Sequence, residues 1–422
     1  MDLYRGTIVY FTDDPKVDAG NSVIFEDGIL FVEDGLVKKT GHFKDYSFKE
    51  SEYTDYTGKI ICPGFVDTHL HYPQTAMIAS YGKQLLEWLE KYAFPEERKF
   101  ENKEYSDKIA KFFIDELTKN GTTTALVMPT VHKSSVDSIF SAALKKNMRL
   151  ISGKVMMDRN APPYLLDTAE SSYEDSKELI NKWHKNGRCL YAVTPRFAPT
   201  STEKQLEKAS LLLDEFDDLY LHSHVAENVD EVKWVKELFK DDKTYQSVYD
   251  RFSLVGKRSV YAHAIYLEDD DYKLLADKGS SISFCPTSNL FIGSGLFNMH
   301  KYMEFNFRLG IGTDVGGGTS FSMLKTLAEA YKVSQLQKYS LSPLQSFYLA
   351  TMGGAKALYL EDKIGSFKEG MEADFIVLDP MATDIMKLRS ENTNNVEELL
   401  FVLMMLGDDR SITSTYIMGK KV

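Results

Sequence analysis

Cysteine is scarce in this chain, and this scarcity limits the classes of protein to which it can belong. The 422 residues include three cysteines, Cys62, Cys189 and Cys285, which are far apart in the sequence. An odd and widely spaced set does not form a disulfide framework, so we expect buried free thiols and a protein of the reducing cytoplasm.

Long apolar runs and an excess of basic charge are also missing. The longest apolar run, residues 399–406, is much shorter than a membrane span, and the first residues contain no apolar stretch typical of a signal peptide. The formal net charge is −12, whereas a protein that binds nucleic acid usually carries a basic excess. We therefore expect a soluble globular protein that binds neither membranes nor nucleic acid.

The two ends of the chain are rich in short β-prone runs. Residues 6–11, 22–25 and 29–32 have this character, with turn signals at residues 13–15 and at Asp27-Gly28 between them. Residues 373–378 and 414–418 repeat it near the other end. The pattern predicts one small, β-sandwich-like domain built from both termini, with residues 1–62 plus 365–422.

The middle of the chain, residues 63–364, alternates between strand and helix patterns. Helical patterns such as residues 107–120, 204–216 and 231–239 separate the expected strands. Eight strands in such alternation predict an α/β fold, the (β/α)₈ TIM barrel. The alternative, an open doubly wound sheet, usually has a Gly-x-Gly-x-x-Gly turn after its first strand, and none is present here. The expected strands are residues 64–69, 123–128, 150–156, 189–193, 219–224, 259–263, 280–284 and 309–313.

Histidine and aspartate gather where several of these strands end. Catalytic groups of a TIM barrel lie at the carboxyl ends of its strands, so these side chains are expected to converge. A single His-x-His is more often an ordinary pair of core or surface histidines than a metal site. Histidines with structural roles would, however, be scattered along the chain rather than gathered at strand ends. The gathered residues are His69, His71, His222, His224, His263 and Asp314.

The spacing of these residues predicts a metal site. Side chains two apart on a strand share a face, so His69 and His71 point to the same side. With a third imidazole and Asp314 they form a nitrogen and oxygen set that suits Zn²⁺, or else Fe²⁺ or Mn²⁺. His222 and His224 also share a face, so spacing leaves both open, and we prefer His224 because it lies nearer the strand end.

The residues around the expected metal suggest hydrolysis. A bound metal generates a hydroxide nucleophile near neutral pH, and the reaction then needs a general base and a general acid. Asp314 is expected to act as the base and Glu227 to carry protons to the substrate and the leaving group. His263 is expected to hold the nucleophile and the tetrahedral centre. Asp67, on the face of His69, is either a partner of the ligands or a polar residue deeper in the barrel.

Four motifs resemble those of the amidohydrolase superfamily. Residues 63–71, Pro-Gly-Phe-Val-Asp-Thr-His-Leu-His, resemble its opening metal motif, and residues 223–227, 262–264 and 312–314 resemble its later ones. The tail at residues 365–374 is similar to the segment that returns the chain to the small β domain in this superfamily. Within the superfamily, residues 72–74, 85–96, 194–197 and 285–295 resemble the guanine deaminases.

The resemblance implies a reaction and a set of roles. It implies one metal, usually zinc, held by His69, His71, His224 and Asp314, with no ligand role carried over for His222. The implied reaction is a step of purine catabolism, the hydrolysis of guanine to xanthine and ammonia, by a homodimer. The implied purine-binding residues are Gln74, Arg196 and Phe197.

These roles suit the chemistry of a purine, although each residue has a simpler explanation. A flat ring with a carbonyl needs amide or guanidinium donors and an apolar surface. Taken alone, Gln74 and Arg196 could be ordinary loop residues and Phe197 part of the core. Trp88 could belong to a lid over the site or to helix packing.

Two rival functions remain open at this stage. The first is a deaminase or chlorohydrolase that acts on another heterocycle, such as cytosine, an adenosine-type base or a triazine. The second is a scaffold protein of the same fold that has lost its metal, although all four expected ligands are present in this sequence.

Overall fold

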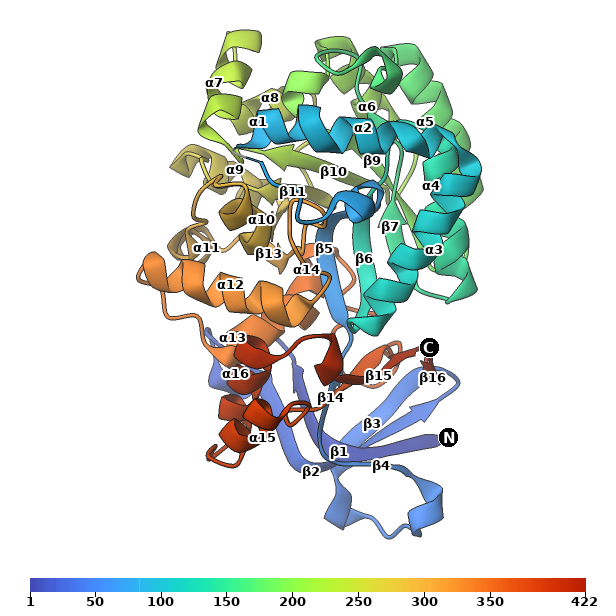
Figure 1. Cartoon of the computed structure of the whole chain (residues 1–422), viewed down its shortest axis with the longest axis vertical. Coiled ribbons are helices and arrows are strands. Elements are labelled where there is room, and N and C mark those ends of the chain that lie inside the picture. The colour runs from blue at the N-terminus through green and yellow to red at the C-terminus, as the bar shows by residue number, and fades with distance from the viewer. Residues whose placement is uncertain (83) are drawn as a thin grey trace.

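Two sheets organise the chain in the computed structural model, which describes residues 1–82 and 84–422 (Figure 1). The first is a parallel sheet in the order β5-β6-β7-β9-β10-β11-β12-β13, with the short strand β8 paired to β9. The bounds are β5 (Phe65–His71), β6 (Thr122–Met128), β7 (Arg149–Ser152), β8 (Val155–Met156), β9 (Cys189–Pro195), β10 (Tyr220–Val225), β11 (Ser259–His263), β12 (Ser281–Phe284) and β13 (Arg308–Ile311).

The parallel sheet curls until its first and last strands meet. Just beyond β13, the N–H of Asp314 donates to the carbonyl of His69 at 2.9 Å. The N–H of His71 donates to the carbonyl of Val315 at 2.6 Å. These bonds join the carboxyl ends of β5 and β13, which confirms the expected (β/α)₈ barrel and excludes the open doubly wound sheet.

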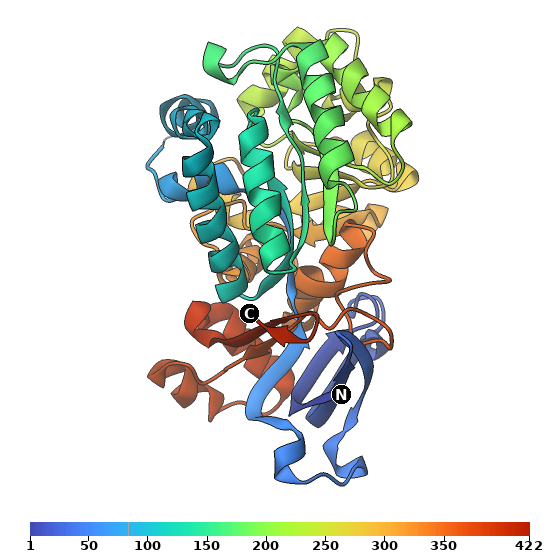
Figure 2. The same cartoon turned by 90° about the vertical axis from the view of Figure 1, so that its right-hand side faces the viewer.

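Helices follow the strands and surround the barrel (Figures 1 and 2). Strands β5 and β6 are buried along their whole length because one face fills the barrel while the other is covered by helices. The helices between the barrel strands are α1 (Leu85–Trp88), α2 (Phe94–Glu97), α3 (Lys103–Lys119), α4 (Lys133–Lys145), α5 (Ala169–Trp183), α6 (Glu203–Glu215), α7 (Val229–Leu238), α8 (Tyr245–Arg251), α9 (Asp269–Lys278), α10 (Pro286–Phe291) and α11 (Met299–Phe305).

The rest of the chain leads from the barrel to the second sheet. This sheet has the order β16-β15-β14-β4-β1-β2-β3, so strands from both termini lie side by side, as the sequence predicts (Figure 2). The remaining α-helices and strands are α12 (Met323–Leu336), α13 (Pro343–Tyr348), α14 (Gly354–Ala357), α15 (Asp384–Ser390), α16 (Val396–Leu406), β1 (Asp2–Phe11), β2 (Ser22–Glu33), β3 (Leu36–His42), β4 (Thr54–Pro63), β14 (Phe375–Leu378), β15 (Ile412–Ile417) and β16 (Lys420–Lys421).

Two strand boundaries differ from those expected. Residues 22–25 and 29–32 belong to one strand, β2. Asp27-Gly28 does not end the strand, because the pairing with β1 continues through an irregularity at which the register shifts between Gly6 and Ile8. The expected strand at residues 150–156 is divided into β7 and β8 around Gly153. A Cβ added at Gly153 would lie 1.8 Å from the carbonyl oxygen of Ala192, so only glycine allows this close approach of backbones.

The three cysteine thiols are free and buried, as expected. Among residues 1–82 and 84–422, every helix is too short or too polar to span a lipid bilayer.

Candidate functional site

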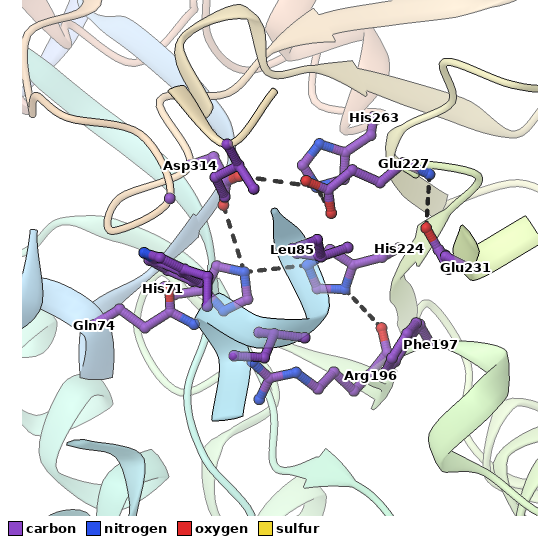
Figure 3. A pocket seen from close by; sticks show the side chains of 14 residues that line it. His71, Gln74, Leu85, Arg196, Phe197, His224, Glu227, Glu231, His263 and Asp314 are labelled. Carbon is purple, nitrogen blue, oxygen red and sulfur yellow. Dashed lines mark hydrogen bonds and ion pairs between the residues drawn. The ribbon is translucent and has the colours of Figure 1, made fainter. Parts of the chain in front are cut away.

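Three histidines, His69, His71 and His224, meet Asp314 at the joined carboxyl ends of the barrel strands. Figure 3 shows the side chains of His71, His224 and Asp314. The Nε2 atoms of His71 and His224 lie 3.2 Å apart. Asp314 Oδ1 lies 3.2 Å from His69 Nε2 and 3.5 Å from His71 Nε2. Ligand atoms at ~2.0–2.1 Å from a tetrahedral metal are about 3.3 Å from one another, so this spacing fits a single ion.

The protonation of the histidines also fits a metal. Burial, followed by the charge that neighbouring histidines would carry, lowers the pKa of His69, His71 and His224 well below its usual value. Neutral imidazoles keep a lone pair for a cation. His69 Nε2 is completely buried and makes no hydrogen bond within the described residues, which is the state expected of a metal ligand.

The structure separates the roles of the two histidines on β10. His224 donates its Nδ1 proton to the carbonyl of Arg196 at 2.7 Å, which leaves Nε2 for the cluster. His222 lies deeper, with Nε2 2.6 Å from Nδ1 of His69. His222 therefore contacts His69 from behind and orients its ring, while His224 joins the group of side chains that could hold a metal.

Asp67 lies behind the cluster as well. Its carboxylate accepts the N–H of His69 at 3.2 Å and the N–H and hydroxyl of Thr313 at 3.1 and 2.5 Å. These bonds tie β5 to the segment that presents Asp314. Burial raises the pKa of Asp67 to about 7. Of the two roles left open by the sequence, the contacts favour support of the ligand residues.

Left-handed backbone at the strand ends turns the functional side chains into the site. His263 has φ of 75°, Asp314 has φ of 49°, and Ala226, just before Glu227, has φ of 48°. Residues other than glycine adopt this conformation at a cost of ~1–3 kcal/mol, and such strain gathers at functional sites. The strand ends are therefore shaped for the site rather than for the stability of the barrel.

Glu227 and His263 form the second half of the cluster. His263 Nε2 lies 3.3 Å from Glu227 Oε2 and 3.8 Å from Asp314 Oδ2, and its Nδ1 donates to Asn289 Oδ1 at 2.8 Å. Burial, followed by the negative charge of Asp314, raises the pKa of Glu227 to about 8. The Ser294 hydroxyl donates to Glu227 Oε1 at 3.0 Å. Glu227 can therefore hold and release a proton near neutral pH.

A pocket opens beside these groups. Its empty volume, which includes open solvent at its mouth, is about 440 Å³. Figure 3 shows Gln74, Arg196 and Phe197 across the pocket from Asp314 and His263. Apolar side chains cover the rest of its wall, and Trp88 is among them. The apolar lining consists of Leu85, Trp88, Leu89, Phe197 and Ile292.

Two buried glutamates that the sequence did not single out complete the site. Glu97 binds both Gln74 and Arg196, and Glu231 accepts the N–H groups of Glu227 and of the following residue at 2.9 and 3.1 Å. Glu231 also accepts the hydroxyl of Tyr245 at 2.7 Å. The capping-box spacing at the start of α7 could have identified Glu231. No local pattern marks Glu97.

The model of the amidohydrolase family matches residues 60–422. The chain belongs to the amidohydrolase family.

Two proteins named guanine deaminase match this amidohydrolase over almost their whole length. Guanine deaminase of Escherichia coli (strain K12) is 53% identical, with 99% of this chain and 97% of that protein covered. The solved structure of E. coli guanine deaminase has a TM-score of 0.97 at 52% identity and covers 100% of this chain and 99% of its own. The solved structure of guanine deaminase from C. acetobutylicum with bound guanine has a TM-score of 0.90 at 30% identity. The match covers 100% of this chain and 99% of that chain. The expected relationship to the guanine deaminases is therefore confirmed.

Proposed function

We propose that this amidohydrolase is a guanine deaminase, which hydrolyses guanine to xanthine and ammonia. One observation carries the proposal: side chains that could hold a metal, the buried carboxyl group of Glu227, and the amide and guanidinium donors of Gln74 and Arg196 surround a single pocket. The similarity to guanine deaminases, one of which has guanine bound in its active site, supports this choice of substrate. It also favours guanine over the cytosine, adenosine-type and triazine alternatives.

His69, His71, His224 and Asp314 would hold one divalent metal, and zinc suits this nitrogen-rich set better than Fe²⁺ or Mn²⁺. When bound, such a metal supplies a water that is deprotonated near neutral pH. All four proposed ligand residues are present in the sequence, which favours an enzyme over a metal-free scaffold protein.

The other residues handle protons and orientation. Asp314 accepts a proton from the attacking water through Oδ2, the oxygen that faces His263. Glu227 delivers its proton from Oε2 to the ring nitrogen. It is then reprotonated by the proton that the attacking water released and passes that proton to the amino group, which departs as ammonia. The hydroxyl of Ser294 fixes the other oxygen of Glu227. His263 holds the oxygen at the tetrahedral centre, since its Nε2 faces both carboxylates.

Gln74, Arg196 and Phe197 would bind the purine. The amide and the guanidinium suit the polar edge of guanine, and Phe197 offers an apolar surface to the ring. Leu85, Trp88 and Leu89 exclude water from the same pocket, which strengthens the polar contacts inside.

The remaining features of the proposal concern the whole protein. We propose a homodimer that works in the cytoplasm, consistent with the free thiols of its cysteines. We also propose residues 1–62 plus 365–422 as one structural domain around a catalytic barrel of residues 63–364.

A substrate panel tests the function. Purified protein is loaded with zinc. Ammonia release is followed with guanine, adenine, adenosine and cytosine, and chloride release with a chlorinated triazine. We expect turnover of guanine at least about a hundredfold faster than of the others, because unpaired pocket donors reject a ring that lacks the matching carbonyl. Metal content measured on the same sample should approach one ion per chain. Absence of guanine turnover in metal-loaded protein would reject the proposal.

A further inference from the structure

Glu97 occupies an unusual place for a carboxylate. It is the last residue of α2, its side chain is 1% exposed, and both of its oxygens face residues of the proposed purine site. Arg196 donates from Nη1 to Oε2 at 2.6 Å and from Nη2 to Oε1 at 2.9 Å. Gln74 donates from Nε2 to Oε1 at 3.1 Å. One carboxylate therefore binds two substrate-site side chains at once.

The same helix holds Arg196 from a second direction. The ring centroid of Phe94 lies 5.4 Å from the guanidinium carbon of Arg196. Phe94 and Glu97 are three residues apart and so share a face of α2. The ring and the bidentate carboxylate together fix the plane of the guanidinium, which determines where its remaining N–H groups point.

Gln74 is fixed by the same contact. Its Nε2 donates to Glu97, and its Oε1 accepts the N–H of Gly316 at 3.4 Å. An amide that has one fixed donor contact cannot exchange its oxygen and nitrogen without losing that bond. Glu97 therefore sets which end of the Gln74 amide faces the ligand.

The charge of Glu97 matters as much as its geometry. Arg196 is 3% exposed, and a buried cation is costly unless a counterion pairs with it. The negative charge of Glu97 cancels the positive charge of the guanidinium, so the ion pair presents no net charge to the pocket. Without Glu97 a full positive charge would face the ligand, and it would attract an anionic ring.

We propose that Glu97 is a positioning residue that orients Gln74 and Arg196 and cancels the guanidinium charge, so that the pocket favours an uncharged purine over an anionic one. The inference rests on the proposed function. Xanthine has a carbonyl where guanine has the amino group, and it therefore loses a proton more readily. Neutralisation by Glu97 prevents an unpaired guanidinium from retaining the ionised product.

The test uses Glu97→Gln in the metal-loaded, full-length protein. We expect KM for guanine to rise about tenfold or more, with a smaller fall in kcat, because the donors lose their orientation while the proton carriers stay in place. Inhibition constants for xanthine and hypoxanthine are measured in mildly alkaline buffer, where a larger fraction of xanthine than of hypoxanthine is ionised. In Glu97→Gln, the ratio of the hypoxanthine inhibition constant to the xanthine inhibition constant should increase by about tenfold. This is a modest effect for one unpaired positive charge beside the ligand.

Glu96→Gln is the matched control. Glu96 is the adjacent glutamate and is also buried, but it pairs with Lys99 and Tyr105 rather than with the pocket. It should leave KM and the ratio of inhibition constants unchanged. Glu97→Asp keeps the charge at a shorter reach, so it should restore the ratio of inhibition constants more than it restores KM.

Three results would overturn the inference: unchanged KM in Glu97→Gln, an unchanged preference for xanthine, or equal changes in Glu96→Gln. Circular dichroism checks that each variant is folded. Binding of hypoxanthine and xanthine is also measured directly by calorimetry, which needs no turnover. If the wild-type protein fails to deaminate guanine, the proposed function fails, while the calorimetric ratio still decides the role of Glu97.

Discussion

His222 and His224 provide a sharp test of the metal site, because they lie two residues apart on one strand with different roles. His224 belongs to the ligand cluster, whereas His222 contacts Nδ1 of His69 at 2.6 Å. The substitutions His222→Leu and His224→Leu remove one imidazole each with little change in volume. Both variants should lower activity, but only the second removes a ligand.

The expected loss of metal affinity in His222→Leu follows from the hydrogen bond that His69 Nδ1 loses. His69 is completely buried, so loss of His222 leaves its Nδ1 without a hydrogen-bond partner, at a cost of ~1–3 kcal/mol. Since 1.4 kcal/mol is about tenfold, metal affinity should fall by roughly 10–100-fold, which is also typical for loss of a residue that orients a metal ligand. His222→Gln places a polar group near the same nitrogen and should recover part of this loss.

The assay is competition for zinc with a chromogenic chelator, combined with activity at increasing free zinc. Excess zinc should restore much of the activity of His222→Leu but little of that of His224→Leu. Equal loss of zinc in the two variants would refute the distinction between them. Zinc retained by His224→Leu and lost by His222→Leu would show that the ligand has been assigned to the wrong histidine.

Two carboxylates and one glycine carry further predictions. Glu227→Gln should keep its metal, measured by elemental analysis, while kcat falls by ~10²–10⁴; a loss below tenfold would contradict proton transfer by this residue. Glu231→Gln weakens the acceptor that holds the backbone of Glu227, so kcat should fall with little change in KM, and a purely raised KM would argue against it. Gly153→Ala would force a Cβ against the carbonyl of Ala192 and should cost at least ~1–3 kcal/mol in unfolding free energy, whereas Gly256→Ala, with open space around it, should leave the melting temperature unchanged.

The barrel could be predicted because each strand is a short apolar run followed by a helical pattern. The expected range 259–263 coincides with β11, and the range 123–128 differs from β6 by one residue at its start. The errors arise where tertiary pairing overrides a local signal. Asp27-Gly28 usually forms a turn, but in β2 it pairs with β1 through an irregularity and the strand continues.

The ligand cluster could be predicted because strand geometry is periodic. His69 and His71 share a face of β5, and the closure of the barrel brings Asp314 to them. The same periodicity could not separate His222 from His224, since both satisfy it. Their difference lies in depth: His224 pairs in register with Ala262, next to His263, while His222 pairs with Val260 further inside.

Glu97 shows why the rest of the site could not be predicted from the sequence. It is 23 residues from Gln74 and 99 residues from Arg196, so no strand or helix period relates the three. A buried guanidinium needs a counterion, and this rule requires some carboxylate beside Arg196. The sequence contains 62 aspartates and glutamates, and only the packing of α2 over the barrel selects one of them. Periodicity therefore predicts the groups that converge as a candidate metal site, while the charge balance of the proposed substrate pocket depends on long-range contacts that only the fold creates.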